Sequence, residues 1–522
     1  MPITQIKTGS PIFDEFYPRI KKFLQADISE FVFDGKLVHG YRSPDSKPIW
    51  LRDHTLMMRG YKYFEKDMTS AVEHFAETQA ANGRLFDYFV VGEERENWAK
   101  YVRVPVEADV EYYLPMAVYT TWQATGNDGW MARMLPHCEA ALQYTMTHPW
   151  RWSSEYDLVK RAYTIDTWDF DYVDGRTPWL NFQIDDKTHF GIFHGDNSGF
   201  YDACNKLASL FHHLGDHTKA ANWRATAEGI RKRANELCWN GHFYTHRIPL
   251  DEFRIPGVDE SAQLSLSNPY DINRGLPTHE MAVEIIKEYQ RRRASTKAFA
   301  EWFSIDPPFP AGIFGDDKLA PGVYINGGIF PLVGGELARA AFEHGFETYG
   351  LDILLRYDKM IRESGETYLW YFPDGRPSTK EASTSPEAQP TDGWGSSAML
   401  GAFIEGLCGI EDRLKLFQMV KLSPRWAVTS LQQATVEVSY GASAAGIGYD
   451  WCLRDDRCDL VILAENAHVH LHLLLPQGKH VTKVLIGRQS IPFTQSAVEN
   501  SRYVDAALDV EKELQLHIEL AG

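Results

Sequence analysis

One local pattern recurs through residues 1–418 and limits the possible folds more than any other feature. It consists of a helix that ends at a glycine, a tight turn and a second helix. AVYTTWQATGND ends at Gly126 before MARMLPHCEAALQY, a second helix stops at Gly215, and LARAAFEHGFE ends at Gly345 before LDILLRYDKMI. Glycine readily adopts the left-handed conformation that closes a helix. The repeated units therefore predict antiparallel helical hairpins.

The helix after Gly215 has clear amphipathic spacing. Apolar residues three or four positions apart form one helix face, as burial against a neighbour requires; they are Trp223, Ala227, Ile230, Ala234 and Leu237. Further helices are predicted near residues 12–25, 54–66, 70–82, 280–291, 294–303 and 394–408. Strands do not alternate with these helices and the hairpins are irregularly spaced, which disfavours an eight-stranded α/β barrel and an open solenoid. A closed ring of hairpins fits better.

The pattern changes to strands after about residue 418. Short strands are predicted over residues 434–441, 458–465, 467–476, 480–487 and 513–520. In the third of these, apolar and polar residues alternate, as in a half-buried strand. The expected fold class is therefore mainly α, with a helical ring over residues 1–418 and a small antiparallel β-sandwich over residues 419–522.

Composition excludes several function classes. Hydrophobic residues make up 44% and charged residues 24%, as in globular proteins. Lys plus Arg is 53 and Asp plus Glu is 71, a net charge of −18, which argues against a nucleic-acid partner. No apolar run approaches the ~18 residues of a membrane span, and the N-terminus shows no signal-peptide pattern. The six cysteines are scattered, so reduced thiols and a cytoplasmic location are expected, and the oligomeric state is left open.

Aromatic residues make up 13% of the chain and gather in the long connections between helices. There they are mixed with acidic residues and glycine, over residues 43–55, 164–179, 189–201, 302–331 and 363–377. Aromatic faces stack on the C–H faces of sugar rings, while carboxylates, Arg and Asn bond to hydroxyl groups. Any one loop could instead supply an aromatic side chain to the core. Five similar loops predict a cleft for an uncharged carbohydrate.

Several of these loops resemble those of a known superfamily. Trp50-Leu51-Arg52-Asp53-His54 resembles the W-x-R-D element of glucoamylase-like and related six-hairpin glycosidases, and YINGGIFP (324–331) resembles their Y-x-N-G-G-I-W-P element. Glu366-Thr367-Tyr368, with the later DGWGSSA (392–398), resembles the E-x-Y and W-S-x-A stretch of debranching-enzyme glucosidase domains and glycoside hydrolase family 63. The C-terminal β region resembles the end of bacterial α-L-rhamnosidases.

The resemblance implies an (α/α)6 barrel that hydrolyses a terminal, α-linked sugar with inversion and needs no cofactor. An inverting enzyme uses one carboxylic acid and one carboxylate base, roughly 6.5–9.5 Å apart. By its position in the motif, Glu366 is the expected base. Glu363 competes for that role, and Glu366 could instead cap or ion-pair with a neighbouring helix.

The expected acid is an aspartate. Thr167-Trp168-Asp169-Phe170-Asp171 is similar to the T-W-M-D element of debranching enzymes, whose Asp is the proton donor and lies two residues after Trp. Here Asp169 lies one residue after Trp168 and Asp171 three, and Asp169 is favoured. Asp196, in GDNS, is a third candidate that could instead cap a helix or bind the sugar.

The resemblance also implies substrate-binding residues. Arg52 and Asp53 are expected to bind hydroxyl groups of the terminal sugar, or else to form a local ion pair. The other expected contacts, each with a place in the core as the alternative, are the stacking residues Trp50, Trp168, Trp370 and Trp394, together with Asn326. The histidines have no carboxylate at ligand spacing, so no metal site is expected. A glycoside phosphorylase of the same fold and a non-catalytic carbohydrate-binding protein are the alternative functions.

Overall fold

The computed structural model describes residues 3–42, 48–92, 97–103, 108–168, 172, 184–314, 319–378 and 391–522. The helices are α1 (Pro11–Asp14), α2 (Phe16–Ala26), α3 (Leu51–Tyr61), α4 (Ser70–Glu77), α5 (Val110–Thr125), α6 (Asp128–Thr147), α7 (His194–His213), α8 (His217–Cys238), α9 (Ser267–Arg274), α10 (His279–Ser295), α11 (Pro331–Glu343), α12 (Glu347–Ser364) and α13 (Gly393–Gly401). A π-helix over Ala402–Leu407 continues α13.

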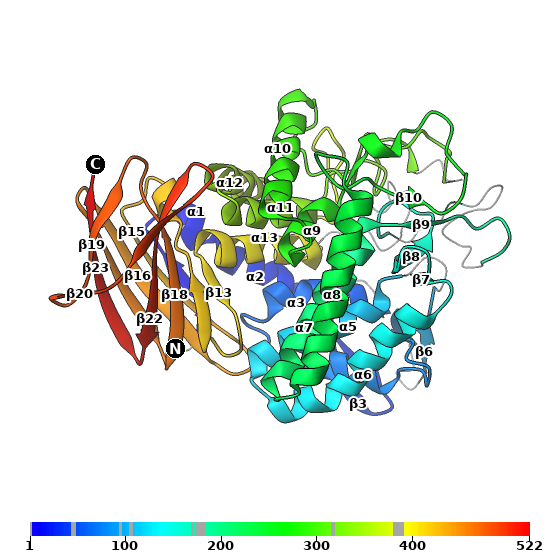
Figure 1. Cartoon of the computed structure of the whole chain (residues 1–522), viewed down its shortest axis with the longest axis horizontal. Coiled ribbons are helices and arrows are strands. Elements are labelled where there is room, and N and C mark those ends of the chain that lie inside the picture. The colour runs from blue at the N-terminus through cyan, green and yellow to red at the C-terminus, as the bar shows by residue number, and fades with distance from the viewer. Residues whose placement is uncertain are drawn as a thin grey trace.

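Six of these helices form a closed inner ring. In chain order, α3, α5, α7, α9, α11 and α13 each contact the next, and α13 contacts α3. The helices that follow them in the chain, α4, α6, α8, α10 and α12, form the outer layer, with α6, α8 and α12 packed against α5, α7 and α11 as hairpins, and α2 packs against α13. Figure 1 shows this helical part beside the sheets formed by the C-terminal strands. The predicted (α/α)6 barrel is confirmed.

The glycine-terminated hairpins form as the sequence predicts. Gly126, Gly215 and Gly345 follow α5, α7 and α11 closely and have φ angles of +69°, +82° and +84°. Helix α8 buries the face that contains Trp223, whereas Leu237 at its end is half-buried. Amphipathic spacing and glycine position therefore define these hairpins locally.

One predicted helix is wrong in part. Helix α10 ends at Ser295, and residues 297–303 are not helical. Their backbone pairs instead with a distant segment: Phe330 N donates to Trp302 O at 2.8 Å, and Ser304 N donates to Gly328 O at 2.8 Å. The apolar residues within 297–303 suggested a helix, because the local sequence does not show pairing with partners so far along the chain.

The C-terminal strands form two sheets. They are β13 (Ile410–Asp412), β14 (Met419–Leu422), β15 (Gln433–Ser439), β16 (Gly446–Arg454), β17 (Arg457–Ala464), β18 (Ala467–Leu474), β19 (His480–Ile486), β20 (Gln489–Ser490), β21 (Thr494–Val498), β22 (Ser501–Val510) and β23 (Glu513–Ala521). One sheet has the order β1-β15-β16-β17-β23-β19-β20, where β1 is Gln5–Lys7, and the other has the order β13-β14-β18-β22-β21.

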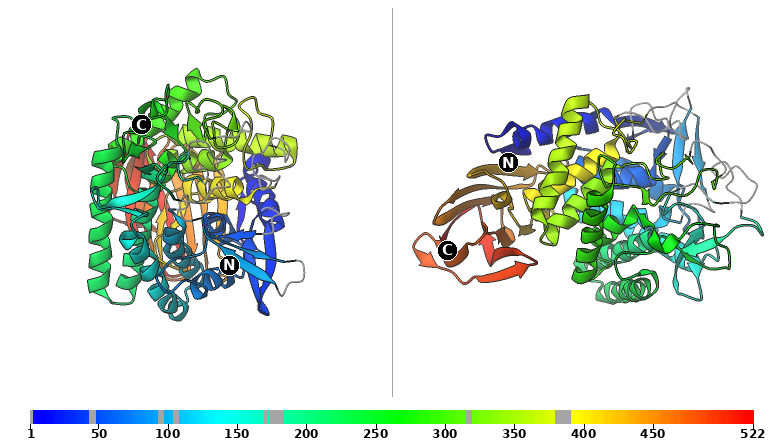
Figure 2. Two further views of the ribbon diagram at one scale, coloured as in Figure 1. Left: turned by 90° about the vertical axis from the view of Figure 1, so that its right-hand side faces the viewer. Right: turned by 90° about the horizontal axis from the view of Figure 1, so that it is seen from above.

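The five strands predicted from the sequence coincide with β15, β17, β18, β19 and β23. Strand β1 was not predicted; it pairs antiparallel with β15, so that Ile6 lies opposite Val436. Both chain ends therefore lie beside the sheets, as Figure 2 shows. The division into domains at residue 418 stays a prediction.

Shorter strands lie in the connections that lead into the inner helices. They are β2 (Ile28–Phe33), β3 (Lys36–Tyr41), β4 (Pro48–Trp50), β5 (Tyr88–Val91), β6 (Trp98–Tyr101), β7 (Trp152–Ser153), β8 (Leu158–Ala162), β9 (Phe190–Ile192), β10 (Ile248–Pro249), β11 (Leu264–Ser265) and β12 (Ile305–Asp306). Strands β4, β9 and β11 end within two residues of α3, α7 and α9. Pairing of these strands therefore fixes where three inner helices begin.

Two further observations concern the chain as a whole. All six cysteines are free thiols, and five of them are buried. In the ranges that the structure describes, none of the helices combines the length and the apolar character that crossing a bilayer demands.

Glycines let the inner helices pack closely. A Cβ atom on Gly335 of α11 would lie 2.5 Å from the backbone carbon of Ala398 in α13. A Cβ atom on Gly334 would lie 2.6 Å from a ring carbon of the buried Trp302. Side chains at these positions would push the two helices apart, so closure of the ring depends on the absence of side chains here.

We expect Gly335→Ala to lower the free energy of unfolding by at least about 2 kcal/mol, because overpacking against backbone cannot be relieved by a side-chain rotation. The control is Gly129→Ala, at an exposed position in the first turn of α6 whose added Cβ would meet nothing closer than 3.6 Å. That variant should change stability by less than about 1 kcal/mol. Urea denaturation measures both, and equal stabilities would contradict the packing account.

Candidate active site

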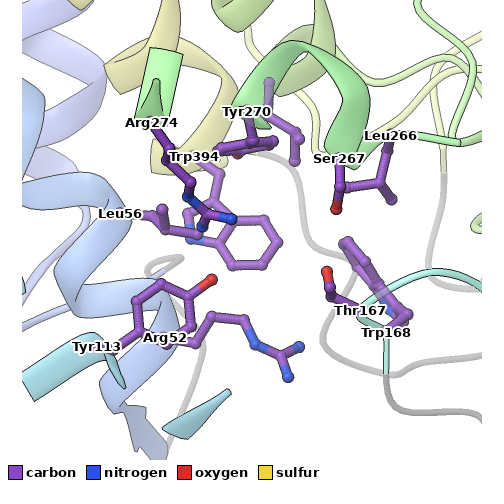
Figure 3. Close-up of a pocket in the computed structure, with 11 residues that line it drawn as sticks. Arg52, Leu56, Tyr113, Thr167, Trp168, Leu266, Ser267, Tyr270, Arg274 and Trp394 are labelled. Carbon is purple, nitrogen blue, oxygen red and sulfur yellow. The ribbon is translucent and has the colours of Figure 1, made fainter. Parts of the chain in front are cut away.

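The first turns of the inner helices surround a recess at one end of the barrel. About 330 Å³ of space lies between its walls, a figure that includes open solvent, and the room for water-sized molecules within it is about 20 Å³. The described residues that line it are Arg52, Leu56, Tyr113, Thr167, Trp168, Leu266, Ser267, Tyr270, Arg274, Leu332 and Trp394 (Figure 3). Of the residues predicted from the sequence, the structure brings Arg52, Trp168 and Trp394 together here. The N-terminal ends of inner helices carry positive partial charge, so this end of the ring favours acidic groups.

Aspartates occupy most of these helix starts. Asp53 and Asp196 lie in the first turns of α3 and α7, and Asp109 and Asp392 are the N-cap residues of α5 and α13. The Asp392 carboxylate accepts hydrogen bonds from Trp394 N at 3.0 Å and Gly395 N at 3.4 Å. The resulting ring of carboxyl groups is the main chemical feature of this end of the barrel.

Arginines from neighbouring segments pair with three of the aspartates. Arg42 forms an ion pair with Asp53. Arg52 binds Asp109 through two nitrogens, Nε at 2.8 Å and Nη2 at 2.9 Å. In the third pair, Arg161 Nη1 lies 3.4 Å from Asp196 Oδ1. Arg52 and Asp53 therefore both form ion pairs, though with Asp109 and Arg42 rather than locally with each other, and Arg52 also lines the recess.

Asp196 is the most unusual of these carboxyl groups. It is fully buried, and its Oδ2 atom has no hydrogen-bond partner among the described residues. Burial raises the pKa of Asp196 to about 6; Arg161 opposes this shift, and the nearby Asp109 and Asp166 add to it. Helix α7 has Phe193 as its N-cap, and the Asp196 side chain caps no backbone N–H of the described chain. The capping interpretation of Asp196 is therefore wrong, and its carboxyl group keeps its proton to a higher pH than an ordinary aspartate does.

Asp169 and Asp171 lie outside the described residues. Trp168, which precedes them, is nearly buried and belongs to the wall of the recess. Its indole Nε1 donates to Tyr324 Oη at 3.0 Å, and its ring meets that of Trp394 edge to face at 5.5 Å. Trp394 in turn donates from Nε1 to Asp53 O at 3.3 Å.

Glu366 follows α12 and is half-buried. Its Oε1 atom accepts hydrogen bonds from Thr367 N and from Thr391 Oγ1, both at 2.8 Å. The second bond joins Glu366 to the segment that leads into α13 and the recess. Glu363, the competing candidate, lies on the surface in the last turn of α12, where Lys359 is 3.8 Å away.

Two buried aspartates lie near Glu366. The Asp27 carboxyl group is fully buried and has no hydrogen-bond partner for either oxygen in the described part of the chain. Burial, together with the charges of Asp392 and Glu366, raises the pKa of Asp27 well above its usual range. Burial also raises the pKa of Asp392 to about 6, against the opposing effect of Arg42. The sequence contains no local signal for Asp27, because it is near Glu366 only in the folded chain.

Five predicted sugar-binding residues and the predicted base Glu366 are absent from the described lining of the recess; the five are Trp50, Asp53, Asp196, Asn326 and Trp370. Trp50 packs against Tyr88, with ring centroids 3.9 Å apart, and Trp370 is fully buried in the core. The Asn326 amide bonds to backbone atoms of Phe309 and Leu319 at 2.7–2.9 Å. These contacts give Trp370 and Asn326 structural roles. Conversely, the recess residues Tyr113, Tyr270 and Arg274 were missed, because they lie in segments without a recognised motif.

A buried cluster around His194 holds the turn before Trp168. His194 Nδ1 lies 2.5 Å from Asp271 Oδ2, and Nε2 lies 2.9 Å from Ser265 Oγ. Asp166 Oδ2 is 3.9 Å from His194 and accepts a hydrogen bond from Ser267 N at 3.1 Å. The cluster therefore joins α7 and α9 to the turn that presents Thr167 and Trp168. No group of three or more His, Cys, Asp or Glu side chains in the described part of the chain is arranged to hold a metal ion.

The protonation of His194 should stabilise the fold. Burial lowers the pKa of His194, but the Asp271 carboxylate and its hydrogen bond, with Asp166 and Asp196, outweigh this effect, so the net pKa is raised. A histidine whose folded pKa exceeds the ordinary value of about 6.5 stabilises the fold fully below that pH. The contribution is lost as the pH rises through the folded pKa.

We therefore expect the free energy of unfolding to fall more steeply above about pH 6.5 in the wild type than in His194→Gln. Urea denaturation at a series of pH values from 6 to 9 measures the two slopes. His470→Gln, on the exposed side of β18, is the control and should keep the wild-type slope. Parallel curves for the wild type and His194→Gln would contradict the role of this cluster.

Comparisons with known proteins identify the fold. No protein-family model and no curated protein matches this sequence. The structure is similar to the α-L-rhamnosidase of Dictyoglumus thermophilum, with a TM-score of 0.61, 12% identity and coverage of 99% of this chain and 50% of that chain. It is also similar to the Streptomyces avermitilis α-L-rhamnosidase complexed with L-rhamnose, with a TM-score of 0.61, 14% identity and coverage of 100% and 42%. The chain has the fold of six-hairpin glycosidases.

A third solved structure matches along nearly its whole length. The glycoside hydrolase family 63 mannosylglycerate hydrolase of Thermus thermophilus, in complex with glucose, has a TM-score of 0.50 and 14% identity; the match covers 74% of this chain and 99% of that chain. By contrast, this chain spans half or less of the length of the two rhamnosidases. The matches to the two rhamnosidases cover 99% and 100% of this chain and therefore include both the (α/α)6 barrel and the C-terminal sheets.

Proposed function

We propose that the protein is a glycoside hydrolase that removes a terminal, α-linked sugar with inversion of configuration. The observation that carries the proposal is a buried carboxyl group, Asp196, whose pKa is raised to about 6 at the end of the barrel that contains the recess. A group of this kind is protonated often enough near neutral pH to act as a general acid. The α-L-rhamnosidases and the mannosylglycerate hydrolase that share the fold support this class of reaction.

In this mechanism Asp196 donates its proton to the glycosidic oxygen, and Asp169 and Asp171 are the alternatives for that step. Glu366 accepts a proton from the water that attacks the opposite face of the sugar. Its hydrogen bonds to Thr367 and Thr391 hold the carboxylate in one orientation. The edge-to-face rings of Trp168 and Trp394 exclude water from the sugar position and provide apolar surface.

The first test concerns the base. A panel of aryl glycosides identifies a substrate, and Glu366→Gln should then lower kcat by about 10²- to 10⁴-fold, as expected for loss of a positioned general base. Glu363→Gln is the matched control, since the same change is made on the exposed surface of α12, and it should retain full activity. The reverse result would assign the base to Glu363. NMR of the first product anomer tests inversion, and a requirement for phosphate would instead indicate a phosphorylase.

The second test concerns the acid. Asp196→Asn should lower kcat strongly for glycosides with poor leaving groups and much less for those with good leaving groups, which depart without protonation. Because the acid must be protonated, wild-type activity should fall as the pH rises above about 6, and this decline should vanish in Asp196→Asn. Asp169→Asn and Asp171→Asn are measured in parallel. Normal hydrolysis by all three variants would refute the mechanism while leaving the fold intact.

A further inference from the structure

Arg274 differs from the other arginines at this end of the barrel. It is the last residue of α9 and is half-buried. Its side chain extends from α9 into the recess, in the same region as the Trp394 indole (Figure 3). Like Leu56 and Tyr270, it also lines a second cavity.

The contacts of Arg274 use only one edge of the guanidinium group. Nη1 donates to Gly195 O and to Ser198 Oγ, both at 3.0 Å. The rings of Tyr270 and Tyr112 lie 5.2 and 5.8 Å from its central carbon. Across the described residues, neither Nε nor Nη2 of Arg274 has a hydrogen-bond partner, and no carboxylate oxygen lies within 4 Å of the group. These contacts fix the orientation of the cation, and the carboxylates of Asp202 and Asp271 act on its charge only from beyond ion-pair distance.

Arg274 is half-buried, so the edge of its guanidinium group that lacks a protein partner is open to water in the absence of a ligand. The guanidinium group stays charged at any ordinary pH, and a cation withdrawn from water is unfavourable unless it is paired. Arg52 and Arg161 satisfy this requirement through Asp109 and Asp196. For Arg274, an anionic group of a ligand is the partner that the described part of the chain does not supply.

The distribution of charge indicates on which side such an anion binds. The described lining of the recess contains two arginines and no carboxylate. The second cavity is lined by five acidic residues, Asp202, Glu336, Glu405, Glu411 and Asp412, and by five basic residues besides Arg274, namely Arg59, Lys62, Lys206, Arg339 and Arg413. Ion pairs within that lining, such as Arg59–Glu336, Lys62–Glu405 and Lys206–Asp202, already compensate these charges, whereas Arg274 has no ion pair of this kind and its attraction favours an anion in the recess.

We propose that Arg274 binds a carboxylate carried by the sugar in the recess, so that the substrate is a glycoside of an acidic sugar such as a uronic acid. Nε and Nη2 form an edge of the guanidinium group that matches the two oxygens of a carboxylate. The inference takes the reaction from the proposed function, but the assignment of the binding site to Arg274 does not depend on that reaction. It replaces the sequence-based expectation of an uncharged sugar.

Titration calorimetry with free sugars tests the assignment. Glucuronate, galacturonate and mannuronate are compared with glucose, galactose and mannose, and acetate and inorganic phosphate serve as free anions. The wild type should bind at least one uronate at least tenfold more tightly than the matching hexose. Equal binding of the hexose, or no binding of any uronate, would overturn the proposal. Acetate or phosphate binding as tight as the best uronate would indicate a free-anion site and would also overturn it.

Variants identify the residue responsible for the preference. Arg274→Gln should reduce the preference for the uronate to less than threefold, and Arg274→Lys, which keeps the charge but not the paired donors, should retain part of it. Arg224→Gln, an identical change of charge at an exposed position of α8, should leave it unchanged. A preference that survives Arg274→Gln would overturn the assignment. Should that variant fail to fold, the wild-type comparison and Arg274→Lys still test whether Arg274 causes the preference for the uronate.

Hydrolysis assays separate this inference from the proposed function. Uronate binding without turnover of any glycoside would refute the hydrolase and leave the Arg274 site intact. Hydrolysis of neutral glycosides, with the corresponding uronides neither bound nor cleaved, would refute the Arg274 site and leave the hydrolase intact. Hydrolysis of an aryl uronide whose kcat/KM falls at least tenfold in Arg274→Gln, with a larger effect on KM than on kcat, supports both.

Discussion

Ion pairs between aspartates at helix starts and arginines on adjacent segments organise the end of the barrel where the recess lies. Arg42 joins the end of β3 to α3, Arg52 joins α3 to α5, and Arg161 joins β8 to α7. Each pair therefore links two neighbouring segments around the ring. Because both partners are buried, the loss of one would leave an uncompensated charge, which costs far more than a surface ion pair contributes. The pairs therefore fix the relative positions of the helix starts.

The exceptions to this pairing are more informative about function than the pairs. On one side, Asp27 and Asp392 have raised pKa values because burial outweighs the nearby Arg42. On the other side, Arg274 has no carboxylate partner among the described residues. Clusters of perturbed carboxyl groups are characteristic of sites that transfer protons, and an unpaired guanidinium group is characteristic of a site that receives an anion. The proposed chemistry and the proposed substrate class depend on these two departures.

Local patterns predicted the helical ring but not the long-range pairings. Glycine positions and apolar spacing were sufficient for the hairpins at Gly126, Gly215 and Gly345, since a helix and its end are local. Strand β1, by contrast, pairs with a strand more than 400 residues away, and no local pattern specifies that partner. In the recess, motif positions were sufficient for Arg52, Trp168 and Trp394. Arg274 could not be predicted, because a missing charge partner is a property of the folded arrangement alone.

Close packing in the barrel also explains why the pKa of Asp196 is raised. A Cβ atom on Gly195 would lie 2.2 Å from Ser267 Oγ and 2.8 Å from Thr167 Cγ2, both on residues that line the recess. The backbone of α7 thus lies directly behind the recess wall, and the carboxyl group of Asp196 is withdrawn from water. Burial of that group raises its pKa to about 6. A larger residue at position 195 would move α7 away from the wall, admit water and lower that pKa, so the glycine is required for chemistry as well as for packing.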